Sequence, residues 1–353
     1  MRPPVPPARG AGFNPDNRFA AQHIELEPDA LVDDDGKPLP LRTQFIRDDS
    51  QSIISWNDSP DIPFRAGLNP YRGCEHGCAY CYARPTHEYL GYSAGLDFES
   101  RIMVKLRAAE LLRAEFTKKS WTPQTIMMSG VTDCYQPVER RLEITRSCLG
   151  VMAEFRNPVG IVTKNHLVTR DIDYLGELAK HKAAGVGISI TTLDGELAKI
   201  LEPRASTPAR RLAAIGELSA AGVRVRVMVA PVIPGLNDHE IPAILAAAKK
   251  AGARFASYIL LRLPLAVAPI FTEWLETHRP GEKDKVLGRI RELRDGALNV
   301  SKFKERMRGA GPAADQISRL FSVAKRRAGF TDEDEPLLAS AFRVPTQQLP
   351  LFD

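Results

Sequence analysis

The sequence predicts an α/β fold in which about six strand–helix units form an open or partial barrel. Short apolar runs alternate with amphipathic segments of helical periodicity between residues 66 and 264. Such alternation implies parallel strands joined by crossover helices. The number of units falls short of the eight that close a full barrel. The 353 residues, 44% of them hydrophobic, are enough to bury a full core.

The expected strands are apolar runs rich in β-branched residues. The first is expected directly before Cys74. The others are expected at residues 125–130, 159–164, 186–191, 223–233 and 255–263.

The expected helices lie between these strands. Residues 138–155 repeat apolar side chains at helical spacing. A second helix should begin with Thr207 as its cap and Pro208 in its first turn, and stop at Gly222. A third is expected at residues 239–252, where a glycine again marks the end.

The segments that flank the barrel region 66–264 lack this alternation. Residues 1–20, rich in Pro, Gly and Arg, are predicted to be flexible, and residues 21–65 to form an extended lead-in with little regular structure. Residues 265–330 are predicted to be a helical extension, and residues 331–353 a polar, partly acidic tail.

Composition narrows the class of protein. The chain has no run of about 18 apolar residues, and its first residues lack the apolar core of a signal peptide. We therefore expect a cytoplasmic protein that makes no membrane contact. The net charge of +5 permits contact with nucleic acid without requiring it.

Three of the five cysteines lie in the stretch "GCEHGCAYC". Cys74, Cys78 and Cys81 have the spacing C-x3-C-x2-C, which in a reducing compartment indicates metal ligands or catalytic groups. An iron–sulfur cluster held by three thiolates keeps one iron open for another ligand. Zinc remains the alternative, because His76 or His87 could supply a fourth ligand.

The cysteine motif, with the aromatic Tyr80 directly before its last cysteine and a barrel pattern after it, resembles the radical S-adenosylmethionine (SAM) superfamily. Further stretches, such as "TDCYQPVERRLEITR" and "LEPRASTPARRL", resemble a bacterial group related to spore photoproduct lyase. The resemblance covers about residues 50–330. It implies a partial (β/α)6 barrel of radical SAM type and a [4Fe-4S] cluster on the three cysteines.

The same resemblance implies the chemistry and its partners. SAM would bind the open iron, and one electron from the cluster would release a 5′-deoxyadenosyl radical that abstracts hydrogen from a substrate. The electron would come from a donor such as flavodoxin or ferredoxin.

Polar residues at the ends of the expected strands receive roles from this resemblance. Ser129, Thr132 and Asp133 would meet the methionyl amino group of SAM, and Asp133 is the favoured acceptor because a carboxylate binds an ammonium well. Lys164 would face the methionyl carboxylate. Ser189 would reach the ribose or the carboxylate.

Tyr80 and Tyr82 would flank the cluster or the adenine, with aromatic core packing as an equal alternative. Spore photoproduct lyase returns a hydrogen atom from a cysteine near this region, where the present chain has Gly130 and Val131. Cys134 is the nearest thiol and the candidate for that role; an ordinary buried cysteine is the slightly favoured alternative.

Three functions remain open on this basis. The first is a radical SAM enzyme that repairs or modifies DNA, and the second is one that acts on a small molecule or peptide. The third is an iron–sulfur protein that serves in redox sensing or interaction without catalysis.

The final residues, "QQLPLFD", resemble the Gln-Leu-x-Leu-Phe peptide by which bacterial DNA polymerases and repair proteins dock on the sliding clamp. Gln348 can form paired hydrogen bonds, and Leu351 and Phe352 can fill an apolar pocket. Pro350 favours an extended chain. The preceding polar stretch would act as a tether. The alternative is a tail that folds back and buries Leu349, Leu351 and Phe352 on the barrel.

Overall fold

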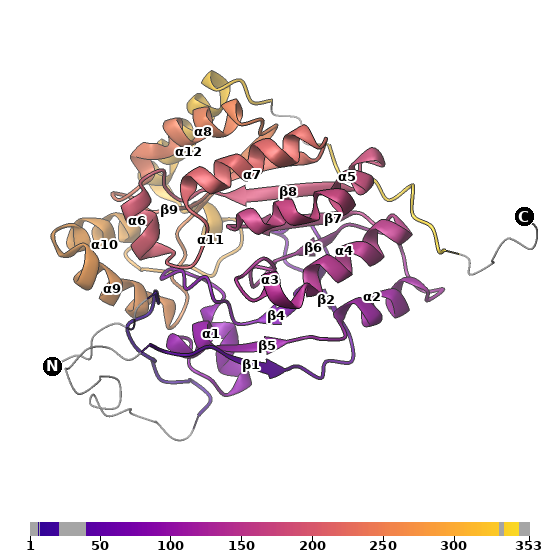
Figure 1. Cartoon of the computed structure of the whole chain (residues 1–353). Helices are drawn as coiled ribbons and strands as arrows, with labels where there is room; N and C mark the ends of the chain where they lie inside the picture. Colours follow the sequence, from indigo (N-terminus) through magenta and orange to yellow (C-terminus); the bar gives the residue numbers. More distant parts are fainter. Residues whose placement is uncertain (1–5, 7, 21–39, 332–334, 346–353) are drawn as a thin grey trace, which may run out of the picture.

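The computed structural model describes residues 6, 8–20, 40–331 and 335–345 (Figure 1). Its centre is a seven-stranded sheet in which six strands run parallel and the edge strand β2 runs antiparallel to β3. In spatial order the strands are β10 (Phe255–Leu260), β9 (Arg224–Val232), β8 (Ala184–Ser189), β7 (Val159–Thr163), β6 (Ile126–Met128), β3 (Ala66–Leu68) and β2 (Ile54–Trp56). Among the described residues β10 and β2 do not pair, so the sheet is an open barrel of the predicted α/β class.

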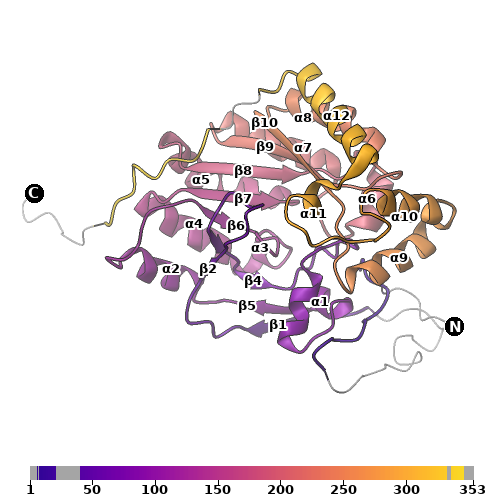
Figure 2. The same ribbon diagram turned by 180° about the vertical axis from the view of Figure 1, so that it is seen from behind.

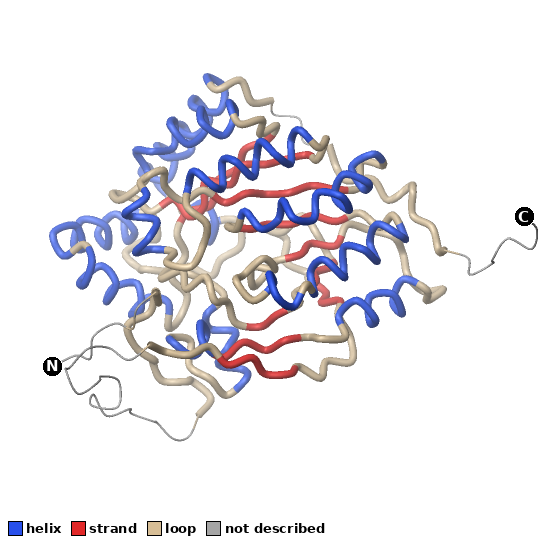
Figure 3. The backbone as a smooth tube through the Cα atoms, in the orientation of Figure 1, coloured by secondary structure: helices blue, strands red, loops and turns tan. Residues whose placement is uncertain are grey.

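Helices cover the outer face of this sheet (Figures 1 and 3). The strands are nearly continuous apolar runs, as expected for parallel strands that are covered on both faces. The covering helices are α2 (Ala108–Phe116), α3 (Glu139–Leu142), α4 (Ile144–Phe155), α5 (Ile172–Lys180), α6 (Gly195–Leu201), α7 (Pro208–Ala220) and α8 (Ile241–Lys250).

Local sequence explains where these helices begin and break. Thr207 caps α7 as predicted, because its side chain accepts a hydrogen bond from the backbone N–H of Arg210 at 3.4 Å. The single helix predicted over 138–155 is divided at Glu143, whose φ of 50° is left-handed. The carboxylate of Glu139 accepts the N–H of Thr145 at 3.0 Å and so satisfies the start of α4.

Residues 265–330 contribute α9 (Val267–His278), α10 (Lys283–Glu292), α11 (Glu305–Arg308) and α12 (Gly311–Arg327). Phe321 of α12 packs on Tyr258 of β10 with ring centroids 4.7 Å apart. The segment around α11 lies over the face of the sheet opposite to α4, α5 and α7 (Figure 2). None of the described helices combines the length and apolar character needed to cross a membrane.

The lead-in is more regular than the sequence predicts. Besides β2, it supplies β1 (Gln44–Arg47), which pairs in parallel with β5 (Arg101–Val104). Strand β4 (Tyr71–Arg72) pairs with the other side of β5, giving a second sheet of three strands. Strands β1 and β2 are short and largely exposed, so their sequences show little apolar pattern. The rest of the described lead-in, residues 40–65, lacks helices and strands and so agrees with the expectation of little regular structure.

Residues 8–20 are also not the flexible segment that composition predicts, because a buried carboxylate anchors them. Glu99 of α1 (Leu96–Ser100) accepts the N–H of Gly10 at 3.1 Å and of Ala11 at 2.9 Å. The same carboxylate forms an ion pair with Arg84, and both side chains are fully buried. Arg84 begins the 3-10 helix η2 (Arg84–Leu90), directly after the cysteine loop.

The described part of the tail packs on the core instead of forming a tether. The ring of Phe342 lies 6.0 Å from Phe116 and 6.2 Å from Phe155. The N–H of Arg343 donates to the carbonyl of Phe155 at 2.9 Å, and the N–H of Leu338 to that of Lys182 at 3.1 Å. These contacts lie where β7 and β8 begin. The proposed docking residues Gln348, Leu349, Leu351 and Phe352 lie outside the described residues.

The Glu99 contacts predict a large loss of stability on substitution. Glu99→Ala should lower the free energy of unfolding by about 3–5 kcal/mol, because it leaves Arg84 charged and unpaired in the interior. Chemical denaturation measures this. Glu110→Ala, which removes an exposed pair with Arg107, should change stability little. Equal effects of the two substitutions would contradict this account of the N-terminal anchor.

Candidate active site

The predicted site residues gather at one edge of the sheet. Strands that run parallel bring their carboxyl ends together, and this edge carries the active site in barrels of this kind. The cysteine loop, residues 73–83, follows β3 and β4. Asp133 follows β6, Lys164 follows β7 and Ser189 ends β8.

The three cysteines occupy this loop as free thiols. Cys74 and Cys78 are buried and Cys81 is half-buried. Burial raises the pKa of all three thiols, and for Cys74 the neighbouring Asp133 and the other two cysteines add to the increase. Arg84 supports the loop by donating to the carbonyl of Cys78 at 2.8 Å.

Gly77 is required within this loop. Its φ of 66° is left-handed, and a side chain there would begin 2.7 Å from the carboxylate of Glu99. The loop can therefore pass this close to Glu99 only with glycine at this position.

The donor set suits an iron–sulfur cluster better than a four-ligand zinc site. His76 is occupied, with Nδ1 3.3 Å from Asp133 and Nε2 3.1 Å from the amide of Asn165. His87 is buried against Phe98, and burial lowers its pKa to about 4. Within the described residues, no group of three or more Cys, His, Asp or Glu side chains is already gathered tightly enough to hold a metal ion. Three thiols on one loop nevertheless match the ligands of a cluster with one open iron.

Asp133 links the cysteine loop to the strand ends. Its Oδ1 accepts from the hydroxyl of Thr163 at 2.8 Å and from the N–H of Tyr135 at 2.9 Å. Its Oδ2 accepts from the N–H of Lys164 at 2.8 Å and lies 3.3 Å from His76. Burial acts to raise the pKa of Asp133, but His76 and these hydrogen bonds outweigh it and hold the pKa below its usual value.

These four contacts fill the acceptor positions of a carboxylate. Asp133 thus connects the cysteine loop to the ends of β6 and β7, and its role as an acceptor for the ammonium of SAM stays a prediction. Thr132 is likewise engaged, since its buried hydroxyl donates to the carbonyl of Tyr71 at 2.8 Å. The hydroxyl of Ser129 accepts the N–H of Cys134 at 2.7 Å.

Lys164 lies in a buried charged network that the sequence did not reveal. Its ammonium donates to the carbonyl of Ala230 at 3.2 Å and lies 3.7 Å from the carboxylate of Glu202. Glu202 also accepts hydrogen bonds from Arg211 and Tyr80. Burial opposes ionisation of Glu202, but the two cations and the hydrogen bonds lower its pKa to about 2. Two cations thus face one carboxylate, which leaves a surplus positive charge beside the thiols.

Of the remaining predicted residues, Tyr80 and Ser189 contact this network, and Tyr82 lies at the surface. Tyr80 is buried in a hydrophobic cluster and its hydroxyl donates to Glu202, so core packing is confirmed for its ring, and contact with the cluster or the adenine stays a prediction. Ser189 is buried, and its carbonyl accepts from Arg211 at 3.1 Å. The side chain of Tyr82 is 46% exposed, and its hydroxyl donates to the carbonyl of Gly130 at 2.7 Å.

Cys134 lies in the protein interior. Its side chain is fully buried in the main core among Tyr71, Tyr135 and Cys148. Burial and the nearby Asp133 raise the pKa of its thiol. This burial fits the interpretation of Cys134 as an ordinary core cysteine, and the hydrogen-donor role stays a prediction.

Comparison with known sequences decides the family. The sequence model of the Radical SAM superfamily matches residues 68–248, which hold the cysteine loop and the ends of β6, β7 and β8 described above. The chain belongs to the radical SAM superfamily. An uncharacterized protein of Mycobacterium tuberculosis, Rv2578c, is 35% identical over 289 residues, which cover 81% of this chain and 82% of that protein. An uncharacterized protein of Methanocaldococcus jannaschii is 32% identical over 173 residues, covering 49% of this chain and 62% of that one.

Solved structures share the fold of this chain. Spore photoproduct lyase complexed with dinucleoside spore photoproduct superposes with a TM-score of 0.51 at 14% identity, covering 67% of each chain. A mutant of the same lyase superposes with a TM-score of 0.55 at 13% identity, covering 81% of this chain and 82% of the other. The radical SAM chain therefore has a spore photoproduct lyase-like fold.

The Asp133 contacts predict a structural effect of substitution. Asp133→Asn should lower the free energy of unfolding by about 1–3 kcal/mol at neutral pH, because an amide group cannot accept all four hydrogen bonds. Since the pKa of Asp133 is lowered in the folded protein, the carboxylate stabilises above its unfolded pKa. The difference should shrink as the pH falls below about 4.

Chemical denaturation across this pH range measures the effect, with Asp58→Asn at an exposed position as the matched control. Unchanged stability together with weakened SAM binding would contradict a role of Asp133 in positioning the cysteine loop. It would support Asp133 as an acceptor for the ammonium of SAM.

Proposed function

We propose that this radical SAM protein is an enzyme whose [4Fe-4S] cluster is held by Cys74, Cys78 and Cys81. The observation that carries the proposal is the set of three free thiols on one loop, at the carboxyl ends of the six parallel strands, inside the segment that matches the superfamily. When bound, the cluster supplies the electron that cleaves SAM and releases a 5′-deoxyadenosyl radical, which abstracts hydrogen from the substrate.

The residues of the chain orient the reactants and exclude water. Lys164 carries the surplus positive charge of the Glu202 network, which suits the carboxylate of SAM. Arg211, fully charged and buried, keeps Glu202 ionised so that Lys164 stays in place. Asp133 holds the cysteine loop through His76. The burial of Cys74 and Cys78 keeps water from this end of the loop.

The proposed substrate is a DNA lesion or another modified site in DNA. The fold is shared with a lyase solved in complex with a dinucleoside photoproduct, and the net charge of +5 favours a polyanion. An electron donor such as flavodoxin or ferredoxin would reduce the protein. A small-molecule or peptide substrate is the second candidate; DNA retention that weakens steeply with salt would favour DNA over it.

The cysteines give the direct test. Protein prepared without oxygen should be brown and contain four irons, and Cys74→Ala, Cys78→Ala or Cys81→Ala should each abolish the colour and the formation of 5′-deoxyadenosine. Iron analysis and chromatography of the products measure these outcomes. A protein that only senses redox state would keep iron and form no 5′-deoxyadenosine.

Cys148→Ala is the matched control, because Cys148 is buried within α4, away from the loop. It should keep both iron and activity. Stoichiometric zinc without iron in natively produced protein would contradict the proposal.

We also propose that the chain docks on the sliding clamp through Gln348, Leu349, Leu351 and Phe352. The described tail packs where β7 and β8 begin, at the edge opposite to the cysteine loop, so a partner bound beyond it would leave the site open. A peptide of residues 347–353 should bind a purified bacterial clamp in the micromolar range. The peptide with Leu351→Ala and Phe352→Ala should not bind. Failure of both the peptide and the full chain to bind would contradict this docking.

A further inference from the structure

We propose that Arg262, Arg294 and Arg306 form a subsite that binds a phosphate of a nucleic-acid substrate beside the cysteine loop. The inference rests on the proposed function for its substrate and adds the residues that would recognise it. None of these arginines belongs to the cysteine loop or to the Lys164 network.

The subsite lies at the carboxyl end of β10 and reaches the cysteine loop. Arg262 follows this strand, and its guanidinium lies 5.3 Å from the ring centroid of Tyr82. Tyr82 directly follows Cys81 and donates to Gly130, which follows β6. A ligand held by Arg262 would therefore lie next to the place where the radical is expected to form.

The three arginines are poorly neutralised. Arg294 is 2% exposed; its Nη2 donates to the carbonyls of Leu261 and Arg306, and its buried Nη1 has no hydrogen-bond partner. The buried Nε of Arg262 also has no hydrogen-bond partner. Within the described residues, the carboxylate that pairs with this group is Asp61, which binds Arg306 at 2.6 Å.

Three guanidinium groups thus share one carboxylate. Burial lowers the pKa of Arg262 and lowers that of Arg294 to about 10, and repulsion within the group contributes to both. Buried charges without a partner are unfavourable and are normally paired. An anionic ligand would supply the missing partner, and its phosphate oxygens would accept from the unsatisfied N–H groups.

The segment that carries Arg306 also shapes the subsite. Arg306 donates to Asp61 and Ser59 in the loop between β2 and β3, and the N–H of Lys304 donates to Asp61 at 2.7 Å. These bonds tie the helical extension to the first strands of the sheet. The same segment contacts β10, and Figure 2 shows α11 in front of the sheet.

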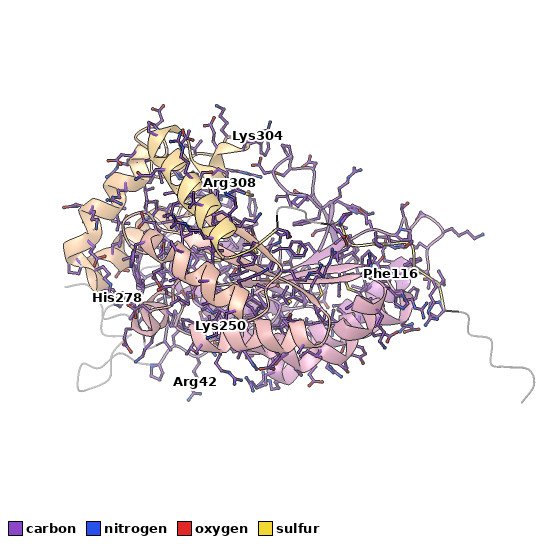
Figure 4. The ribbon with its side chains drawn as sticks, turned by 90° about the horizontal axis from the view of Figure 1, so that it is seen from above. Arg42, Phe116, Lys250, His278, Lys304 and Arg308 are labelled. Carbon is purple, nitrogen blue, oxygen red and sulfur yellow. The ribbon has the colours of Figure 1, made fainter. Side chains whose placement is uncertain are left out.

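Exposed aromatic rings beside the arginines favour nucleic acid over other anions. Tyr82 is 46% exposed and Phe303 is 50% exposed, and the guanidinium of Arg306 lies 4.8 Å from the Phe303 ring centroid. Rings of this kind stack on bases while adjacent cations hold the backbone of a single strand. Lys304, at the outer margin of the molecule in Figure 4, extends the positive charge along the same segment.

The test uses the full-length protein and Arg262→Gln, with Arg319→Gln on the exposed face of α12 as the matched control. The probe is a single-stranded DNA of about twelve nucleotides, a length within the range of site sizes of proteins that bind single strands. A second strand with an uncharged methylphosphonate backbone separates phosphate recognition from base stacking. SAM binding is measured in parallel on protein that contains the cluster.

Arg262→Gln should weaken binding of the charged strand about tenfold or more, as expected for a lost hydrogen bond between charged groups. It should also reduce the steepness of the plot of log binding constant against log salt concentration by about 0.7, which is the contribution of one phosphate contact in a single strand. Binding of the uncharged strand and SAM binding should stay the same, and the thermal stability of the free protein should not fall, because the substitution removes an unpaired charge. Arg319→Gln should alter none of these quantities.

Two results would overturn the inference. Weaker SAM binding with unchanged DNA binding would assign the arginines to the SAM carboxylate. Unchanged binding of both ligands would show that the arginines are structural. Formation of 5′-deoxyadenosine by the wild-type protein tests the proposed radical chemistry separately, so a failure of the subsite is distinguishable from a failure of that chemistry.

Discussion

Buried carboxylates hold the loop that carries the three cysteines, and the rest of the site depends on this arrangement. The loop has no regular secondary structure of its own between β4 and η2. Glu99 holds it through Arg84, Glu202 through Tyr80, and Asp133 through His76. Each carboxylate comes from a different part of the chain, so the shape of the loop depends on contacts with the rest of the fold.

This arrangement separates two positive regions on either side of the loop. On one side, Lys164 and Arg211 outnumber Glu202, which suits the carboxylate of a bound SAM. On the other, Arg262, Arg294 and Arg306 outnumber Asp61, which suits a phosphate of the substrate. The surplus charge in each place is costly in the free protein and becomes favourable when an anion binds.

Sequence patterns were sufficient for the sheet and the cysteine loop but not for the contacts around them. The strands were predictable because parallel strands covered on both faces are continuous apolar runs. The partners of Glu99 and Asp133 were not, because Gly10 and His76 lie far away in the chain and no local pattern marks such pairs. The orientation of Cys134 was also hidden, since it follows an irregular turn in which side-chain alternation gives no direction. The two stretches quoted for the resemblance did contain Glu202, Arg211 and Glu139, but these charges lie among other polar residues, so their burial carried no local signal.

The central claim is that this chain uses SAM for radical chemistry on DNA. The most direct measurement is the amount of 5′-deoxyadenosine formed by the reduced, cluster-containing protein with SAM, in the presence and absence of ultraviolet-irradiated DNA. The account predicts that 5′-deoxyadenosine forms and that irradiated DNA increases its amount. Formation that does not respond to DNA would contradict the proposed substrate, and no formation under either condition would contradict the radical chemistry itself.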